Sequence, residues 1–224
     1  MLNLSQSLSL SAIKESWSPT DETSVVAWYR NKTGITLNGT DVSDWADSAN
    51  SYDMEQDDAD EQPAYNTSTG ALTFDSSDAQ NLQTSSQISL TGAFTIGIRL
   101  YPTGDFDATF LGDNTSNNYL FKYTSTSNIR VKIGGTAGNI PLDSGTFGDD
   151  YLVITRDGSN VITLHKNGVA QSTTITKSGT ALIDAIGVRA TDINSYDGTI
   201  SEVQIYSSTS SDLTATVNDY LSSI

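Results

Sequence analysis

The sequence contains no cysteine and a single histidine. Without cysteine, the chain has no disulfide framework, no zinc–thiolate site and no thiol nucleophile. With His165 alone, it can assemble neither a Ser-His-Asp triad nor a catalytic zinc centre, and we expect this residue to be exposed at a strand edge. Long apolar runs are missing too, so no segment reaches the length of a membrane span. The N-terminus lacks the basic region and the apolar run of a signal peptide.

Basic residues are also scarce. The chain has 11 Lys and Arg against 27 Asp and Glu, which gives a formal net charge of −16. A field of this sign repels the phosphates of nucleic acids and of anionic membranes. We therefore expect neither nucleic acid nor membrane as a partner, and we expect an acidic, well-solvated surface.

The apolar residues alternate with polar ones, which is typical of β-strands with one face on a core. In segment 93–101 one strand face carries Phe94, Ile96, Ile98 and Leu100. Asn167-Gly168 is the dipeptide of a type I′ hairpin turn. Further strands are predicted at residues 24–30, 42–47, 71–75, 81–83, 108–111, 119–123, 129–133, 151–156, 161–166 and 169–175. Many short strands separated by turn residues indicate an all-β sandwich.

The C-terminal region combines a strand with a helix. Segment 197–206 is rich in β-formers, but Ile200 and Val203 have opposite parity, so a bulge is expected between them. A helical period follows in Leu213, Val217, Tyr220 and Leu221. Ser210 or Ser211 is the expected N-cap of this short helix.

The first 22 residues differ from the rest. Apolar and polar residues alternate here, with leucines at Leu2, Leu4, Leu8 and Leu10, and Trp17 follows as an anchor for whatever the segment contacts. A segment of this kind can add a strand to a neighbouring sheet, in its own chain or in a partner, and the sequence leaves both open. We therefore divide the chain into an N-terminal arm, residues 1–22, and a sandwich, residues 23–224.

Several segments occur in an order that is familiar. The succession VVAWYR, VSDWAD, LTFD, FTIGIRLYP, YLVITRDGSN, HKNGV and DGTISEVQIY, closing on DYL, resembles the laminin G-like branch of the concanavalin A-like lectin/glucanase superfamily, in its bacterial and phage versions. The resemblance implies an antiparallel jelly-roll sandwich of two sheets. It also implies binding of glycans or proteins, often with a calcium ion at the rim, and a structural role in many surface or virion proteins.

The candidate binding residues lie in predicted loops. Asp107, Asp113 and Asn114 offer oxygen ligands for calcium, and an Asx-rich turn satisfied by its own backbone is the alternative. Aromatic residues near loops could stack on sugars: Tyr52, Tyr65, Tyr119, Tyr123 and Tyr196. Trp28 and Trp45 fit the core instead. The resemblance implies that a glucanase would carry its carboxylates on one strand in a Glu-x-Asp-x-Glu pattern. The acidic segment 55–61 lacks the last Glu of this pattern and lies in a polar loop, so no catalytic residue is predicted.

These features lead to two functional expectations. The first is a non-enzymatic virion structural protein, a capsid decoration or fibre-associated module, whose arm binds a capsid or tail/fibre protein; it would be made in the host cytoplasm. The alternative is a glycan-binding lectin module for surface or host attachment, with calcium as an optional ligand and no other cofactor.

Overall fold

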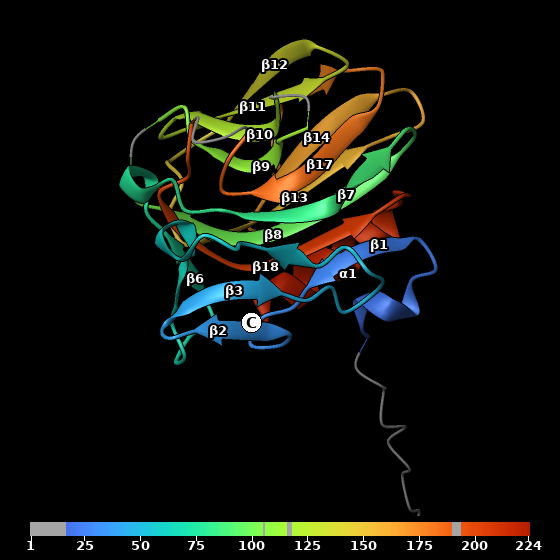
Figure 1. The fold of residues 1–224 in the computed structure, drawn as a ribbon. Coiled ribbons are helices and arrows are strands. Elements are labelled where there is room, and N and C mark those ends of the chain that lie inside the picture. Colours follow the sequence, from blue (N-terminus) through green and yellow to red (C-terminus); the bar gives the residue numbers. More distant parts are fainter. Residues whose placement is uncertain (1–16, 105, 116–117, 190–193) are drawn as a thin grey trace, which may run out of the picture.

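Two antiparallel β-sheets pack face to face (Figure 1). The computed structural model describes residues 17–104, 106–115, 118–189 and 194–224. One sheet, here the helix-side sheet, runs in the order β1 (Val25–Tyr29), β18 (Gly198–Tyr206), β8 (Phe94–Pro102), β13 (Asp150–Arg156) and β14 (Val161–Lys166). The short strands β15 (Val169–Ala170) and β16 (Ile175–Thr176) pair along β14.

The second sheet, here the long sheet, extends from β2 at the bottom of Figure 1 to β12 at the top. Its order is β2 (Ile35–Asn38), β3 (Asp41–Trp45), β4 (Met54–Glu55), β7 (Leu82–Leu90), β17 (Ala181–Ile186), β9 (Thr109–Asp113), β10 (Asn118–Ser125), β11 (Asn128–Ile133) and β12 (Thr136–Pro141). The strands β5 (Ala64–Tyr65) and β6 (Leu72–Phe74) connect β3 to β18 and so bridge the two sheets.

Alternate residues of both sheets fill the space between them. Large side chains without exposed surface lie there, including Trp45, Phe94, Phe110 and Leu82. Three 3-10 turns lie in the loops: η1 (Pro19–Asp21), η2 (Ala59–Glu61) and η3 (Ser76–Asp78). The all-β sandwich predicted from the alternation is confirmed.

The helix α1 (Ser211–Ser222) covers part of the outer face of the helix-side sheet. Ser210 is the N-cap, since its Oγ accepts a hydrogen bond from the backbone N–H of Leu213 at 3.0 Å. The helix approaches the sheet closely over Gly97, where a Cβ would lie 2.6 Å from Cγ1 of Val217. In the described part of the chain, no helix is long and apolar enough to cross a membrane.

The predicted bulge is confirmed in β18. Its pairing with β8 shifts register between Ile200 and Glu202, so that Ser201 is the extra residue. After the bulge, Val203 and Ile205 belong to the core between the sheets. The same shift places Glu202 opposite Arg99 of β8, whose guanidinium bonds to α1 on the outer face.

Most predicted strands are confirmed, and one is wrong. Residues 169–175 do not form a continuous strand, because the centre of this segment bonds elsewhere: Oε1 of Gln171 accepts from the backbone N–H of Asp143, and Ser172 donates to the Asp143 carboxylate. Five strands were not predicted: β2, β4, β5, β12 and β17. The type I′ turn is confirmed, with positive φ at both Asn167 and Gly168.

Candidate functional site

The outer face of the helix-side sheet carries a second apolar cluster. Leu213, Val217 and Leu221 of α1 pack there on Val153 and Tyr206. At the edge of the cluster the rings of Trp17 and Tyr220 meet edge to face, with centroids 5.8 Å apart. The N-terminal segment of the described chain is therefore held against the last turns of α1.

A groove of about 990 Å³ lies between residues 17–20, β1 and the last turns of α1. We call it the helix groove. Its aromatic lining residues are Trp17, Trp28 and Tyr220, and its charged ones are Arg30 and Asp219. Hydroxyl groups surround them, among them those of Thr20, Thr33 and Thr216. Aromatic rings with hydroxyl, carboxylate and guanidinium groups form a surface suited to ligands with apolar faces and polar edges.

Trp28 is fixed in the wall of the groove. Its indole N–H donates to Oε1 of Glu202 at 2.5 Å, and only 5% of its surface is exposed. The guanidinium of Arg30 lies 5.2 Å from the centroid of the Trp28 ring, and Tyr220 meets the same indole at 6.2 Å. Arg30 itself is exposed at the groove.

Glu202 lies beneath Trp28 and has no exposed surface. Its carboxylate also accepts from the backbone N–H of Asn31 at 2.6 Å and from Nε2 of Gln204 at 3.0 Å. Burial raises the pKa of Glu202 to about 7, and the hydrogen bonds from Asn31, Gln204 and Trp28 limit this rise, as does the charge of Arg30. The groove is therefore built on a carboxyl group that titrates near neutral pH.

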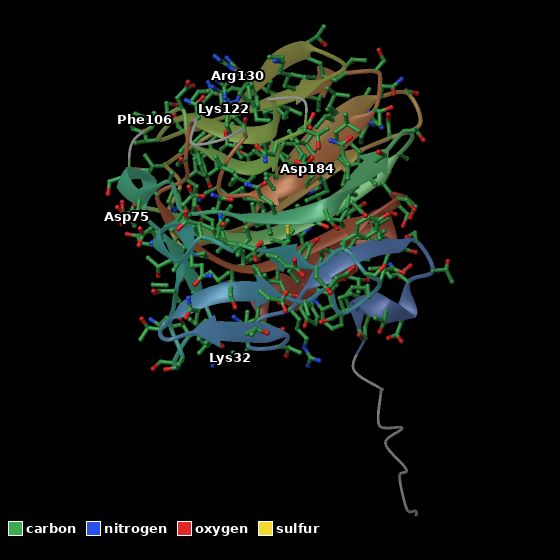
Figure 2. The ribbon with its side chains drawn as sticks, in the orientation of Figure 1. Lys32, Asp75, Phe106, Lys122, Arg130 and Asp184 are labelled. Atoms are coloured by element: carbon green, nitrogen blue, oxygen red, sulfur yellow. The ribbon has the colours of Figure 1, made fainter. Side chains whose placement is uncertain are left out.

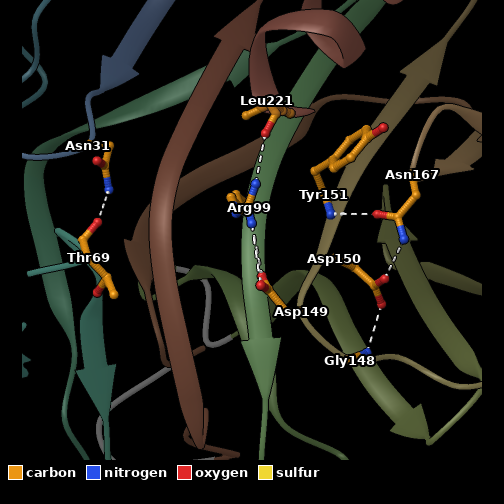
Figure 3. A network of polar contacts seen from close by, with 9 residues as sticks. All are labelled: Asn31, Thr69, Arg99, Gly148, Asp149, Asp150, Tyr151, Asn167 and Leu221. Atoms are coloured by element: carbon orange, nitrogen blue, oxygen red, sulfur yellow. Dashed lines mark hydrogen bonds and ion pairs between the residues drawn. The ribbon is translucent and has the colours of Figure 1, made fainter. Parts of the chain in front are cut away.

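A second depression, here the polar groove, lies on the same face and has a volume of about 550 Å³. Figure 3 shows part of its polar network: Arg99 donates to the carbonyl of Leu221 at 3.1 Å and pairs with Asp149 at 3.3 Å. Asn31 donates to the carbonyl of Thr69 at 3.1 Å. Tyr101 also lines this groove and is 44% exposed. Asn31 connects the two depressions, because its backbone N–H bonds to Glu202 while its side chain lines the polar groove.

The predicted calcium residues divide between two places. Asp113 and Asn114 end β9 beside the buried Asp184: Gln87 donates to both aspartates, and the Asn114 N–H donates to Asp184 at 2.5 Å. Asp107 lies before the other end of β9 and pairs with Lys122 at 2.6 Å, and Lys122 and Asp184 lie well apart in Figure 2. Across the described residues, no group of three or more His, Asp or Glu is placed to hold a metal ion. Calcium binding stays a prediction.

The predicted partner-binding residues are placed only in part. Trp17 is half-buried against Tyr220 of its own chain. Leu2, Leu4, Leu8 and Leu10 lie outside the described residues. Partner binding by these leucines stays a prediction.

The predicted burial of the aromatic residues and of His165 is confirmed for some residues and wrong for others. Trp28 and Trp45 are buried, as expected. Five tyrosines near loops were expected to be available to sugars. Tyr119, Tyr123 and Tyr196 are buried, so the expectation is wrong for these three, whereas Tyr52 and Tyr65 are half-buried. His165, expected to be exposed, is half-buried, and burial lowers its pKa.

Arg30 and Tyr220 were not predicted to be groove residues. Tyr220 was assigned to the apolar face of the helix. Its place at the border of that face was the sequence signal that it could also line a groove.

The acidic segment 55–61 is mostly exposed and includes η2, where Asp58 accepts from the backbone N–H of Asp60 at 3.1 Å.

Solved structures with this fold come from several larger proteins. The binding domain of Paraclostridial Mosquitocidal Protein 1 is 14% identical, with a TM-score of 0.57, over 92% of this chain and 53% of that one. The Botulinum neurotoxin serotype D ligand binding domain, in complex with N-acetylneuraminic acid, is 14% identical with a TM-score of 0.63, over the same shares. Trypanosoma rangeli sialidase is 13% identical with a TM-score of 0.57, over 88% of this chain and 33% of that one. The chain thus spans about half the length of the toxin domains and a third of the sialidase.

No curated protein sequence matches the chain. The sequence model of one family does match, over residues 74–214, which is more than half of the 224 residues. It covers the strands from the end of β6 to β18 and the start of α1. The chain belongs to the concanavalin A-like lectin/glucanases superfamily.

Proposed function

We propose that this protein is a non-enzymatic glycan-binding module and that the helix groove holds the sugar. The observation that carries the proposal is the groove itself, where the rings of Trp17, Trp28 and Tyr220 surround an exposed Arg30 and the carboxylate of Asp219. Apolar faces of sugars stack on aromatic rings, and their hydroxyls bond to charged and amide groups.

The comparisons support a binding role of this kind. The family is named for lectins as well as glucanases, and the toxin domain of similar fold was solved with N-acetylneuraminic acid. A sialidase also shares the fold over a third of its length, and we propose binding rather than catalysis because the helix groove is lined by a single carboxylate, that of Asp219, among its described residues. The virion structural role stays a prediction, because it depends on residues 1–16.

A glycan array tests the proposal, with the full chain probed with and without calcium. We expect a restricted set of glycans to bind, and calorimetry on those glycans then locates the site. Arg30→Gln should weaken binding about tenfold, because it removes a charge-assisted hydrogen bond. Arg130→Gln is the matched control, since Arg130 loses the same charge but bonds to Asn139 of β12 on the long sheet.

Two results would contradict the proposal in different ways. A blank array from folded protein would remove the glycan-binding function. Binding that survives Arg30→Gln but is lost in Tyr101→Ala would keep the function and move the sugar to the polar groove, which Tyr101 lines.

A further inference from the structure

A third depression differs in chemistry from both grooves. It has a volume of about 270 Å³ and opens where β8 ends, beside the residues that lead into β9 and β18. Its apolar lining residues are Pro102, Phe106, Ala108, Tyr123 and Phe147. It shares no lining residue with the helix groove or the polar groove. We call it the aromatic pocket.

Three aromatic rings form its walls. The buried ring of Tyr123 meets that of Phe147 edge to face, with centroids 4.7 Å apart. Phe106 is 53% exposed, which is the largest exposed fraction of any aromatic side chain in the described residues, and it lies at the edge of the molecule in Figure 2. An occupant of the pocket would therefore contact the buried ring of Tyr123 and the half-buried ring of Phe147, and it would cover the exposed ring of Phe106.

A carboxylate completes the wall. Asp197 is half-buried there, packs closely over Gly104 and accepts a hydrogen bond from Oγ1 of Thr103 at 3.2 Å. None of the three ion pairs found among the described residues involves Asp197. The described residues that line the pocket include no lysine or arginine, so the local field is negative.

These features select for a cation. The faces of aromatic rings carry partial negative charge and attract ammonium groups, most strongly where water is excluded. A carboxylate in the wall adds a direct attraction, and the net charge of −16 attracts cations to the surface as a whole. An alkylated ammonium fits better than a bare one, because its methyl groups suit apolar walls and it is weakly hydrated.

We propose that the aromatic pocket binds a small alkylated ammonium ion of the choline type. Phe106, Tyr123 and Phe147 surround the alkyl groups, and Asp197 balances the charge. The same chemistry occurs in free choline and in the phosphocholine headgroup, and the ligands used in the test distinguish these two sources.

Calorimetry with three ligands tests the proposal on the full chain: choline, phosphocholine, and the neutral isostere of choline in which carbon replaces nitrogen. Choline should bind about tenfold more tightly than the isostere, because the two share a shape and differ in charge. Phosphocholine binding as tightly as choline would identify a headgroup site. Weaker binding of phosphocholine would identify a site for the free cation, since the acidic surroundings repel phosphate.

Two variants locate the site. Asp197→Asn should weaken choline about tenfold and leave the isostere unchanged. Asp57→Asn removes the same charge from an exposed loop and is the matched control. Phe106→Ala should weaken choline about fivefold, and because Phe106 is exposed, its loss should leave the unfolding midpoint unchanged.

The proposal is overturned if the isostere binds as tightly as choline, because the pocket then recognises shape alone. It is overturned equally if folded protein binds neither ligand, or if Asp197→Asn affects choline no more than Asp57→Asn. These outcomes are independent of the glycan array, since the pocket and the helix groove have no residue in common.

Discussion

Among the acidic and basic side chains of the described residues, Arg156 and Glu202 have no exposed surface, and they are held in opposite ways. Arg156 ends β13, and its guanidinium donates to backbone carbonyls: Nε to Gly92 at 2.7 Å, Nη1 to Gly179 at 2.7 Å, and Nη2 to Leu90 at 2.8 Å and to Gly92. It also lies 4.8 Å from the centroid of the Phe94 ring. Its partners are main-chain groups at the end of β7 and in the loops that hold Gly92 and Gly179, so this charge holds the ends of several strands together.

Glu202 takes its partners from the residues around the two grooves instead. One donor is the side chain of Trp28 in the wall of the helix groove, and another is the backbone of Asn31, whose side chain lines the polar groove. Burial raises the pKa of Glu202 to about 7 and lowers the pKa of Arg156. Arg156 thus links the ends of strands, whereas Glu202 links the two grooves through its hydrogen bonds to Trp28 and Asn31.

Removing the Arg156 charge should have the largest effect on stability. Arg156→Met keeps the apolar stem but leaves three carbonyls without their donor, and we expect the free energy of unfolding to fall by roughly 4 kcal/mol. Urea unfolding measures it. Arg130→Met is the control, because that arginine bonds to a side chain on the exposed face of β11 and β12, and its loss should cost under about 1 kcal/mol. Equal losses of unfolding free energy in the two variants would show that the burial of the Arg156 charge does not determine its contribution to stability.

The pH dependence of stability should separate Glu202 from Arg156. A carboxyl whose pKa is raised from 4.5 to about 7 in the folded protein holds its proton more tightly there than in the unfolded chain. Its contribution to stability is therefore complete below the unfolded pKa and is lost as the pH rises through the folded one. The loss is on the order of 3 kcal/mol.

In Glu202→Gln, the free energy of unfolding should no longer show the part of its fall between pH 5 and pH 8 that comes from the Glu202 carboxyl. Urea unfolding at each pH measures this free energy. Glu55→Gln is the matched control, since Glu55 is exposed and should leave the slope unchanged. If the wild-type protein and Glu202→Gln lose stability in parallel across this range, the buried carboxyl does not titrate near neutrality.

A substitution at the close contact between α1 and the sheet should have the next largest effect on the free energy of unfolding. Gly97→Ala places a Cβ against Val217 and Leu221, so α1 must move outward, at a cost of about 2 kcal/mol. Because Tyr220 belongs to the same helix, glycan binding should weaken as well. Gly92→Ala is the control, because a Cβ there meets nothing within 4 Å. A stable Gly97→Ala variant with unchanged glycan affinity would show that the position of α1 does not shape the groove.

The parts of the fold that depend on neighbouring residues could be predicted from the sequence. The parts that depend on pairing between distant segments of the chain could not. The alternation in β8, the Asn167-Gly168 turn, the bulge after Ile200 and the capped helix are each encoded within a few neighbouring residues. The edge strand β12 was missed because it contains Gly138 and Pro141 and few β-formers, so that pairing with β11 decides its conformation.

The candidate site lies beyond local prediction for the same reason. Trp17, Trp28 and Tyr220 come from the start, the first strand and the last helix, and nothing in their spacing shows that they meet. Trp28 was assigned to the core because it lies in the pattern of a buried strand. The structure confirms its burial, since 95% of its surface is covered, but Trp28 also lines the groove. The burial of Glu202 could not be predicted, because a glutamate in a strand is usually exposed and only the bulge and β1 together enclose it.

The smallest expected effect concerns Trp17, and it decides whether the described N-terminal segment belongs to the binding face. Trp17→Ala removes an edge-to-face contact with Tyr220 and leaves the two sheets intact, so the free energy of unfolding should fall by only about 1 kcal/mol. Glycan affinity should fall about fivefold, because the groove loses one of its three rings. Trp17→Phe should recover most of both losses. If Trp17→Ala lowers stability but leaves affinity unchanged, Trp17 only anchors the chain to α1, and the face built over Glu202 binds its ligand through Trp28, Arg30 and Tyr220 alone.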